Sequence, residues 1–102
     1  MDAARLARIL SALGSEPRLR IIASLQVEST HVSELARRLG MSRPLLYQHL
    51  NRLEAARLIE SGVEQLGESR LRKHYWVSSF HLEVAPALIA ALIDQEQERN
   101  SS

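Results

Sequence analysis

The chain has 102 residues, of which 45% are apolar and 25% charged, a balance typical of one soluble globular domain rather than of a disordered segment. The absence of cysteine excludes disulfides, thiolate metal sites and thiol redox sensing, and the absence of a long apolar run or a secretory signal makes a cytoplasmic location, with no membrane partner, the expectation. The net charge of +1 conceals a basic middle and an acidic end, and the basic residues are almost all arginine, the cation best suited to phosphates and guanine.

Two helices are predicted at the start of the chain. Apolar residues recur at helical spacing through residues 2–13, and Gly14 is placed to end that helix. Ser15 can cap a second helix with Pro17 in its first turn, where a missing N–H costs nothing. The expected buried stripe of this second helix is Leu19, Ile22, Ala23 and Leu25.

Residues 32–56 are predicted to form a helix-turn-helix. Its first helix, residues 32–39, ends at Gly40, which can adopt the left-handed conformation. Its second helix, residues 42–56, begins at the capping residue Ser42. Two short helices joined by a tight turn that contains glycine are the signature of this motif. The inward residues of the first helix are expected to be Val32, Leu35, Ala36 and Leu39.

The two faces of the helix over residues 42–56 differ in chemistry. Leu46, Leu50 and Leu53 follow one another at spacings of four and three, which suffices to dock the helix on a core. The opposite face offers donors, acceptors, an aromatic ring and guanidinium groups, which suit base edges and phosphates. We predict DNA contacts from this helix by Ser42, Arg43, Pro44, Leu45, Tyr47, Gln48, Asn51 and Arg52.

Within this set, Arg43 and Gln48 are the predicted base contacts, because the leading turns of such helices meet the bases. Asn51 and Arg52, further along, are expected to contact phosphates. Two alternatives stay open for Tyr47: contact with a sugar or thymine methyl, or partial burial against the preceding helix. His49, next to Leu50, is expected to be structural.

Residues 59–78 are predicted to form a wing, a hairpin of IESGVEQ and LRKHYWVS around a turn with Gly67. Alternation places Leu71, Tyr75 and Val77 on one face of the second strand. Arg70, Arg72, His74 and Trp76 fall on the other face. Arg70, Arg72 and Lys73 are the predicted phosphate contacts of the wing, unless the hairpin only solubilises the domain. Trp76 is expected to pack on the terminal helix or, less readily, to line an effector pocket.

A last helix is predicted over residues 84–98, with an apolar stripe of Ala85, Leu88, Ile89, Leu92 and Ile93. A small winged-helix core has little room for this stripe and that of the first helix, so pairing across a two-fold axis is expected. Residues 1–14 and 80–102 are therefore the predicted dimerisation helices. The predicted interface residues are Leu6, Ile9, Leu10, Leu13, Leu88, Ile89, Leu92 and Ile93.

The sequence resembles the arsenic-repressor (ArsR-type) family of transcription regulators through residues 6–78, in the segments LGSEPRLRIIASL, SELARRLGMSRPLLYQHLNRLEAARLI and HYWVS. The resemblance implies a mainly α fold with a small β-hairpin, a winged helix-turn-helix that fills the single domain of residues 1–102. It also implies a homodimer that binds double-stranded DNA, with residues 42–56 as recognition helix and the terminal helices as dimer interface.

The sequence departs from the family in two places. Family metal sensors carry a Cys-x-Cys pair where this chain has His31, Val32 and Ser33, and its terminal region has a single histidine, so no metal and no cofactor are predicted. Relatives usually have glycine where this chain has Arg57. A left-handed arginine costs about 1 kcal/mol, so either the helix ends differently or Arg57 regains that cost at a phosphate.

The predicted function is a homodimeric regulator, by resemblance a repressor, that binds a pseudo-palindromic operator. An effector, if one exists, would be an organic ligand or a protein partner. The alternatives are a winged-helix protein-interaction adaptor and a non-specific architectural DNA-binding protein. Catalysis is not predicted, since the sequence has no glycine-rich phosphate loop, no cysteine nucleophile and no H-E-x-x-H helix.

Overall fold

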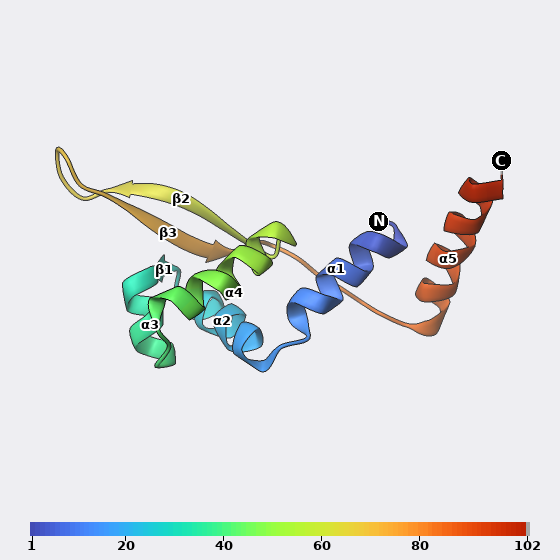
Figure 1. Ribbon diagram of the computed structural model, residues 1–102, viewed down its shortest axis with the longest axis horizontal. Coiled ribbons are helices and arrows are strands. Elements are labelled where there is room, and N and C mark those ends of the chain that lie inside the picture. Colours follow the sequence, from blue (N-terminus) through green and yellow to red (C-terminus); the bar gives the residue numbers. More distant parts are fainter. Residues whose placement is uncertain (102) are drawn as a thin grey trace.

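The computed structural model describes residues 1–101, which form five helices and three strands (Figure 1). In chain order these are α1 (Ala3–Leu13), α2 (Glu16–Val27), β1 (Thr30–His31), α3 (Val32–Leu39), α4 (Arg43–Ala55), β2 (Ile59–Gln65), β3 (Leu71–Val77) and α5 (Pro86–Ser101). The strands form an antiparallel sheet in the order β1-β3-β2. The predicted mainly α fold with a hairpin is confirmed, and the two-residue strand β1 is an addition that the sequence did not indicate.

The molecule is elongated, with extents of 56 × 28 × 22 Å. Helices α2, α3 and α4 pack together beneath the sheet, and the β2–β3 hairpin projects beyond them (Figure 1). After β3 an extended segment leads away from this body to α5, which packs against α1. The predicted last helix starts two residues later than expected, at Pro86, since proline at the first helical position needs no N–H partner.

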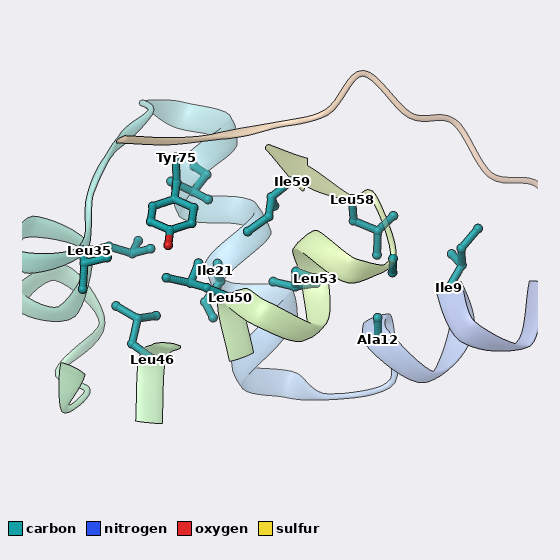
Figure 2. Close-up of a cluster of buried hydrophobic side chains, with 13 residues drawn as sticks. Ile9, Ala12, Ile21, Leu35, Leu46, Leu50, Leu53, Leu58, Ile59 and Tyr75 are labelled. Carbon is teal, nitrogen blue, oxygen red and sulfur yellow. The ribbon is translucent and has the colours of Figure 1, made fainter. Parts of the chain in front are cut away.

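The core lies between α2, α3, α4 and the sheet. Leu46, Leu50 and Leu53 of α4 are fully buried, as their spacing predicted, and each burial contributes about 1.5–3 kcal/mol. Tyr75 of β3 points from the sheet into this cluster, where Leu35 of α3 also lies (Figure 2). The core therefore holds α4 by one face and leaves the opposite face free.

The predicted stripe of α2 is partly wrong. Leu19 is 51% exposed and Ala23 is also exposed, whereas Ile21 is completely buried and Arg18 is only 8% exposed. The buried face begins at Arg18 and continues through Ile21 to Leu25, a helical spacing of three and four. A charged residue at the head of this face hid it from a pattern built on apolar residues alone.

The helix-turn-helix has the predicted caps. The hydroxyl of Ser42 accepts the N–H of Leu45 at 3.4 Å and caps α4. Gly40 ends α3 in the left-handed conformation, with φ 61° and ψ 38°. Its turn is closed by the N–H of Met41, which donates to the carbonyl of Ala36 at 3.1 Å.

Helix α4 ends by the same geometry without a glycine. Arg57 has φ 61°, so the helix does not exit differently from its relatives. The N–H of Leu58 donates to the carbonyl of Leu53 at 3.0 Å, and that of Arg57 donates to the carbonyl of Glu54 at 2.9 Å. These two bonds define a Schellman motif, in which a left-handed residue is strained unless it is glycine.

Candidate nucleic-acid interface

The leading half of α4 is open to solvent. Arg43, Pro44 and Gln48 are exposed, and Leu45 and Tyr47 are 44% and 43% exposed. Within residues 1–101, the side chains of Arg43 and Gln48 make no hydrogen bond or ion pair with the protein. Their donors and acceptors are therefore available to an external partner.

The trailing half of α4 is tied to its neighbours. Arg52 donates from Nη2 to the hydroxyl of Ser11 on α1 at 3.0 Å, and Glu54 accepts the hydroxyl of Ser61 on β2 at 2.7 Å. Asn51, the residue before Arg52, is exposed. Arg52 is thus not the wholly solvent-directed cation that the sequence suggested, although its guanidinium keeps donors beyond the one that Ser11 uses.

A buried arginine, which the sequence did not reveal, joins three helices at this point. The guanidinium of Arg18 on α2 donates to the carbonyls of Ala12 at 2.6 Å and Ser11 at 3.3 Å, near the carboxyl end of α1. These carbonyls lie at the negative end of the helix dipole, where a cation is favoured. The third contact of Arg18 is Nη1 to Nδ1 of His49 on α4, at 3.1 Å.

That contact fixes the protonation of His49. Arginine only donates, so Nδ1 accepts and the ring is neutral with its proton on Nε2. Burial lowers the pKa of His49, and the charges of Arg18 and Arg52 lower it further. His49 therefore has the structural role expected of it, with Arg18 as its hydrogen-bond partner. Through these bonds α1, α2 and α4 meet at one point. We call Arg18, His49 and the two α1 carbonyls the arginine node.

Two of the three cations predicted for the wing are paired with acids. Arg72 donates from Nε and Nη2 to Glu64 across the hairpin at 3.3 and 3.0 Å, and the Arg72 contact lowers the pKa of Glu64. Lys73 lies with Nζ 3.9 Å from Glu54 of α4 and 5.4 Å from the centre of the Tyr75 ring. Arg70, the residue before β3, is exposed.

Trp76 does not reach the terminal helix. Its ring lies over Gly62 of β2, where an added Cβ would come 3.2 Å from the ring, and its Nε1 donates to Glu60 at 3.1 Å. The expectation that Trp76 packs on the last helix is therefore wrong, because the pairing of β2 with β3 places it across from Glu60.

A cleft of about 200 Å³ lies between the start of α4 and the wing. Arg43 and Tyr47 line one side, and Leu71, Arg72 and Lys73 line the other. The leading half of the recognition helix and the near part of the wing thus border one concave surface.

Comparison with known proteins gives this surface a context. The arsR family of bacterial regulatory proteins matches residues 15–61. An HTH-type transcriptional regulator of Methanocaldococcus jannaschii is 34% identical over 85 residues, covering 83% of this chain and 88% of the relative. The chain belongs to the ArsR family. The family resemblance seen in the sequence is confirmed, and the chain is a transcriptional regulator with a winged helix-turn-helix DNA-binding domain rather than an enzyme.

Solved structures of this ArsR protein's relatives share its fold. NolR of Sinorhizobium fredii is 27% identical with a TM-score of 0.63, covering 93% of this chain and 84% of NolR. A homodimeric winged helix-turn-helix DNA-binding domain of Mycobacterium bovis is 23% identical with a TM-score of 0.65, covering 96% of this chain and 80% of that one. The second likeness is one of fold alone.

The eight residues predicted for a dimer interface have different surroundings in the single chain. Ile9 lies in the core and Leu13 packs against it, while Leu6 and Leu92 are buried where α1 meets α5. Leu88 is partly buried. By contrast, large apolar side chains stay exposed around a cavity of about 180 Å³ between α1 and α5, namely Leu10 at 41%, Ile89 at 46% and Ile93 at 41%.

No metal centre emerges from the described part of this ArsR chain. Among residues 1–101, no group of three or more histidine, aspartate or glutamate side chains is arranged to hold an ion. His81 and Glu83 approach each other to 3.5 Å, but both side chains are largely exposed, at 85% and 87%. The same residues contain no helix that is both long and apolar enough to traverse a bilayer.

Proposed function

We propose that the chain is a sequence-specific repressor that binds a pseudo-palindromic operator as a homodimer. The observation that carries this proposal is the leading half of α4, where Arg43 and Gln48 are exposed without partners in the described residues, on a helix fixed by a fully buried opposite face. Side chains held ready on a rigid helix can form bidentate contacts with base edges at little cost in ordering.

The contacts divide by type. Arg43 and Gln48 read bases in the major groove, and Tyr47 contacts a sugar or thymine methyl beside them. Asn51, Arg52 and the hydroxyl of Ser42 contact phosphates and set the register. Pro44 and Leu45 add apolar contact at the leading end. On the wing, Arg70, Arg72 and Lys73 approach the backbone, the last two with the donors that their acidic partners leave unused.

Dimerisation uses the face between α1 and α5. Leu10, Ile89 and Ile93 are exposed there beside one apolar cavity, and an apolar face of this kind is stabilised by burial against a second copy. The homodimeric state of the Mycobacterium bovis domain with the same fold supports this proposal. A two-fold axis through this face would place two α4 helices on successive turns of the major groove.

The dimer can be tested with one substitution and its control. Ile93→Asp places a charge in the apolar face and is expected to convert the dimer to monomer in light scattering at micromolar concentration. Val27→Asp changes an apolar residue that is 88% exposed on α2 and should leave the dimer intact. A wild-type chain that is monomeric at that concentration would contradict the dimer.

Repression implies a means of release. An effector that changes the angle between the two α4 helices would lower operator affinity. The lack of cysteine and of a second terminal histidine favours an organic ligand, a protein partner or no effector at all. A cytoplasmic location, with access to the chromosome, follows from the proposal.

The deciding experiment measures binding of the full chain to its own upstream DNA and to a random duplex, each titrated with salt. A preference of about a thousandfold or more for the upstream DNA is expected, and Arg43→Glu should abolish it. Arg20→Glu, which changes an exposed arginine on α2, is the matched control. Equal, salt-dependent binding to both duplexes would favour the architectural alternative, and no binding at low salt would favour the protein adaptor.

A further inference from the structure

The wing presents an exposed apolar surface. Val63 of β2 and Leu71 of β3 are each 70% exposed. In the strand register Val63 stands opposite Lys73 and Leu71 opposite Gln65, so both lie on the sheet face that Tyr75 uses to enter the core. The hairpin that carries this face projects beyond the helices (Figure 1). We call Val63 and Leu71 the wing pair.

The charges of the hairpin do not account for DNA binding by this surface. Three acids and three cations occupy the hairpin from Ile59 to Val77, so its formal charge is zero with neutral histidine. Arg72 is bonded twice to Glu64, and Lys73 lies 3.9 Å from Glu54. Of the three wing cations only Arg70 lacks an acidic partner in the described residues. The wing therefore has little charge left over for phosphates, and an apolar contact by the wing pair would add to what Arg70 supplies.

The wing pair adjoins the surface that faces DNA. Leu71 borders the same cleft of about 200 Å³ as Arg43 and Tyr47 of α4. A duplex seated on α4 therefore runs past Leu71, and the continuation of the wing lies over the neighbouring minor groove. Apolar side chains are used in minor grooves to contact sugars and base edges without hydrogen bonding.

We propose that Val63 and Leu71 form an apolar contact in the minor groove beside each half-site and so select A·T pairs there. This rests on the proposed operator binding and adds a specificity determinant to it. In the minor groove a G·C pair differs from A·T by the guanine amino group. Apolar side chains cannot accept its hydrogen bond, and burying an unpaired donor is unfavourable. G·C pairs at this position are therefore disfavoured.

The test starts from the hydroxyl-radical footprint of the full chain on its upstream DNA, which locates the flanking minor groove. The base pairs at that position are then made A·T, G·C or inosine·C, the last having no minor-groove amino group. Wild type is expected to bind A·T and inosine·C flanks alike and G·C about fivefold more weakly or worse. An inosine·C flank that behaves as G·C would overturn the proposal.

The wing pair is tested by Val63→Thr with Leu71→Thr, substitutions that place threonine, a β-branched residue suited to strands, at both exposed positions. Affinity for the A·T flank is expected to fall on the order of tenfold, the flank preference to vanish, and the salt slope to stay unchanged, since no phosphate contact is lost. Val27→Thr on α2 is the matched control.

Failure of this inference is distinct from failure of the proposed function. A double variant that discriminates flanks as wild type does overturns the wing contact, while specific binding to upstream DNA still stands. A wild-type chain that binds upstream and random duplexes equally overturns both.

Discussion

The two halves of α4 are built for different tasks. Its leading half exposes Arg43 and Gln48 without partners in the described residues, while its trailing half is bonded to α1, α2 and β2 through His49, Arg52 and Glu54. Both halves share one buried stripe, so the difference is not in packing. It lies in how the outward polar groups are used.

The comparison shows how one helix can be both held and free. Hydrogen bonds at the trailing half set the orientation of the helix, and a rigid helix then carries that orientation to the leading half. The residues that read DNA need no supporting contacts of their own. The contact on which the trailing half most depends is that of Arg18 with His49.

Arg18→Met should give the largest effect. The change keeps much of the side-chain volume but leaves the carbonyls of Ser11 and Ala12 and Nδ1 of His49 without their donor. We expect a loss of about 2–3 kcal/mol in the free energy of unfolding, measured by urea denaturation. Arg20→Met, on the exposed side of the same helix, should cost less than about 0.5 kcal/mol. Equal stabilities for the two variants would show that the arginine node does not stabilise the fold.

Arg43→Ala and Arg52→Ala separate the two halves in DNA binding. Loss of Arg43 should weaken operator binding by about 1–3 kcal/mol and relax sequence preference, because a base contact is lost. Loss of Arg52 should weaken binding to operator and random duplexes alike and reduce the salt slope by about one. Fluorescence anisotropy over a salt series measures both. If Arg52→Ala changes sequence preference and Arg43→Ala does not, the assignment of base contacts to the leading half is wrong.

The ends of α3 and α4 share φ 61° with different residues, so opposite substitutions should have opposite effects. Arg57→Gly is expected to stabilise the fold by about 1 kcal/mol by removing left-handed strain. Gly40→Ala, whose Cβ would meet nothing within 4 Å, should destabilise it by a similar amount through backbone strain alone. Thermal unfolding measures both. If Arg57→Gly stabilises the protein but weakens operator binding, Arg57 contacts a phosphate.

The smallest expected effect is a pH dependence. Burial and the charges of Arg18 and Arg52 hold the pKa of His49 below 6.5 in the folded chain, so the unfolded chain binds the proton more readily. The contribution of His49 to stability is therefore complete above pH 6.5 and is lost as the pH falls through its folded pKa. His49→Asn, which retains an acceptor without titrating, should flatten this part of the pH–stability curve. His31 has a pKa lowered by burial too, and His31→Asn is the companion variant that isolates the His49 effect.

Local rules predicted much of the fold. The side chain of Ser42 caps the start of α4, and Gly40, which has no side chain, ends α3 in the left-handed conformation. The leucine spacing of α4 determines its buried face. Strand β1 escaped prediction because its two residues are extended only through pairing with β3. Arg18 escaped because its partners are carbonyls and a histidine that become neighbours only when three helices meet.

The candidate site was predictable to a similar degree. Residues of α4 were assigned to the outward face by periodicity, and the structure places them there. The wing cations were not resolved by periodicity, since the pairing of Arg72 with Glu64 and of Lys73 with Glu54 depends on register and tertiary contact. Sequence patterns assign faces, and they do not show which charges neutralise one another.

The arginine node also gives the molecule a mechanical property. Helix α1 has 11 residues, which makes it about 16 Å long. Arg18 pins it at the end beside α4, and α5 rests along its length towards the other end. A tilt of about 10° about that pin moves the free end by about 3 Å. Helix α1 thus links the packing of α5 at one end to the arginine node beside the recognition helix at the other.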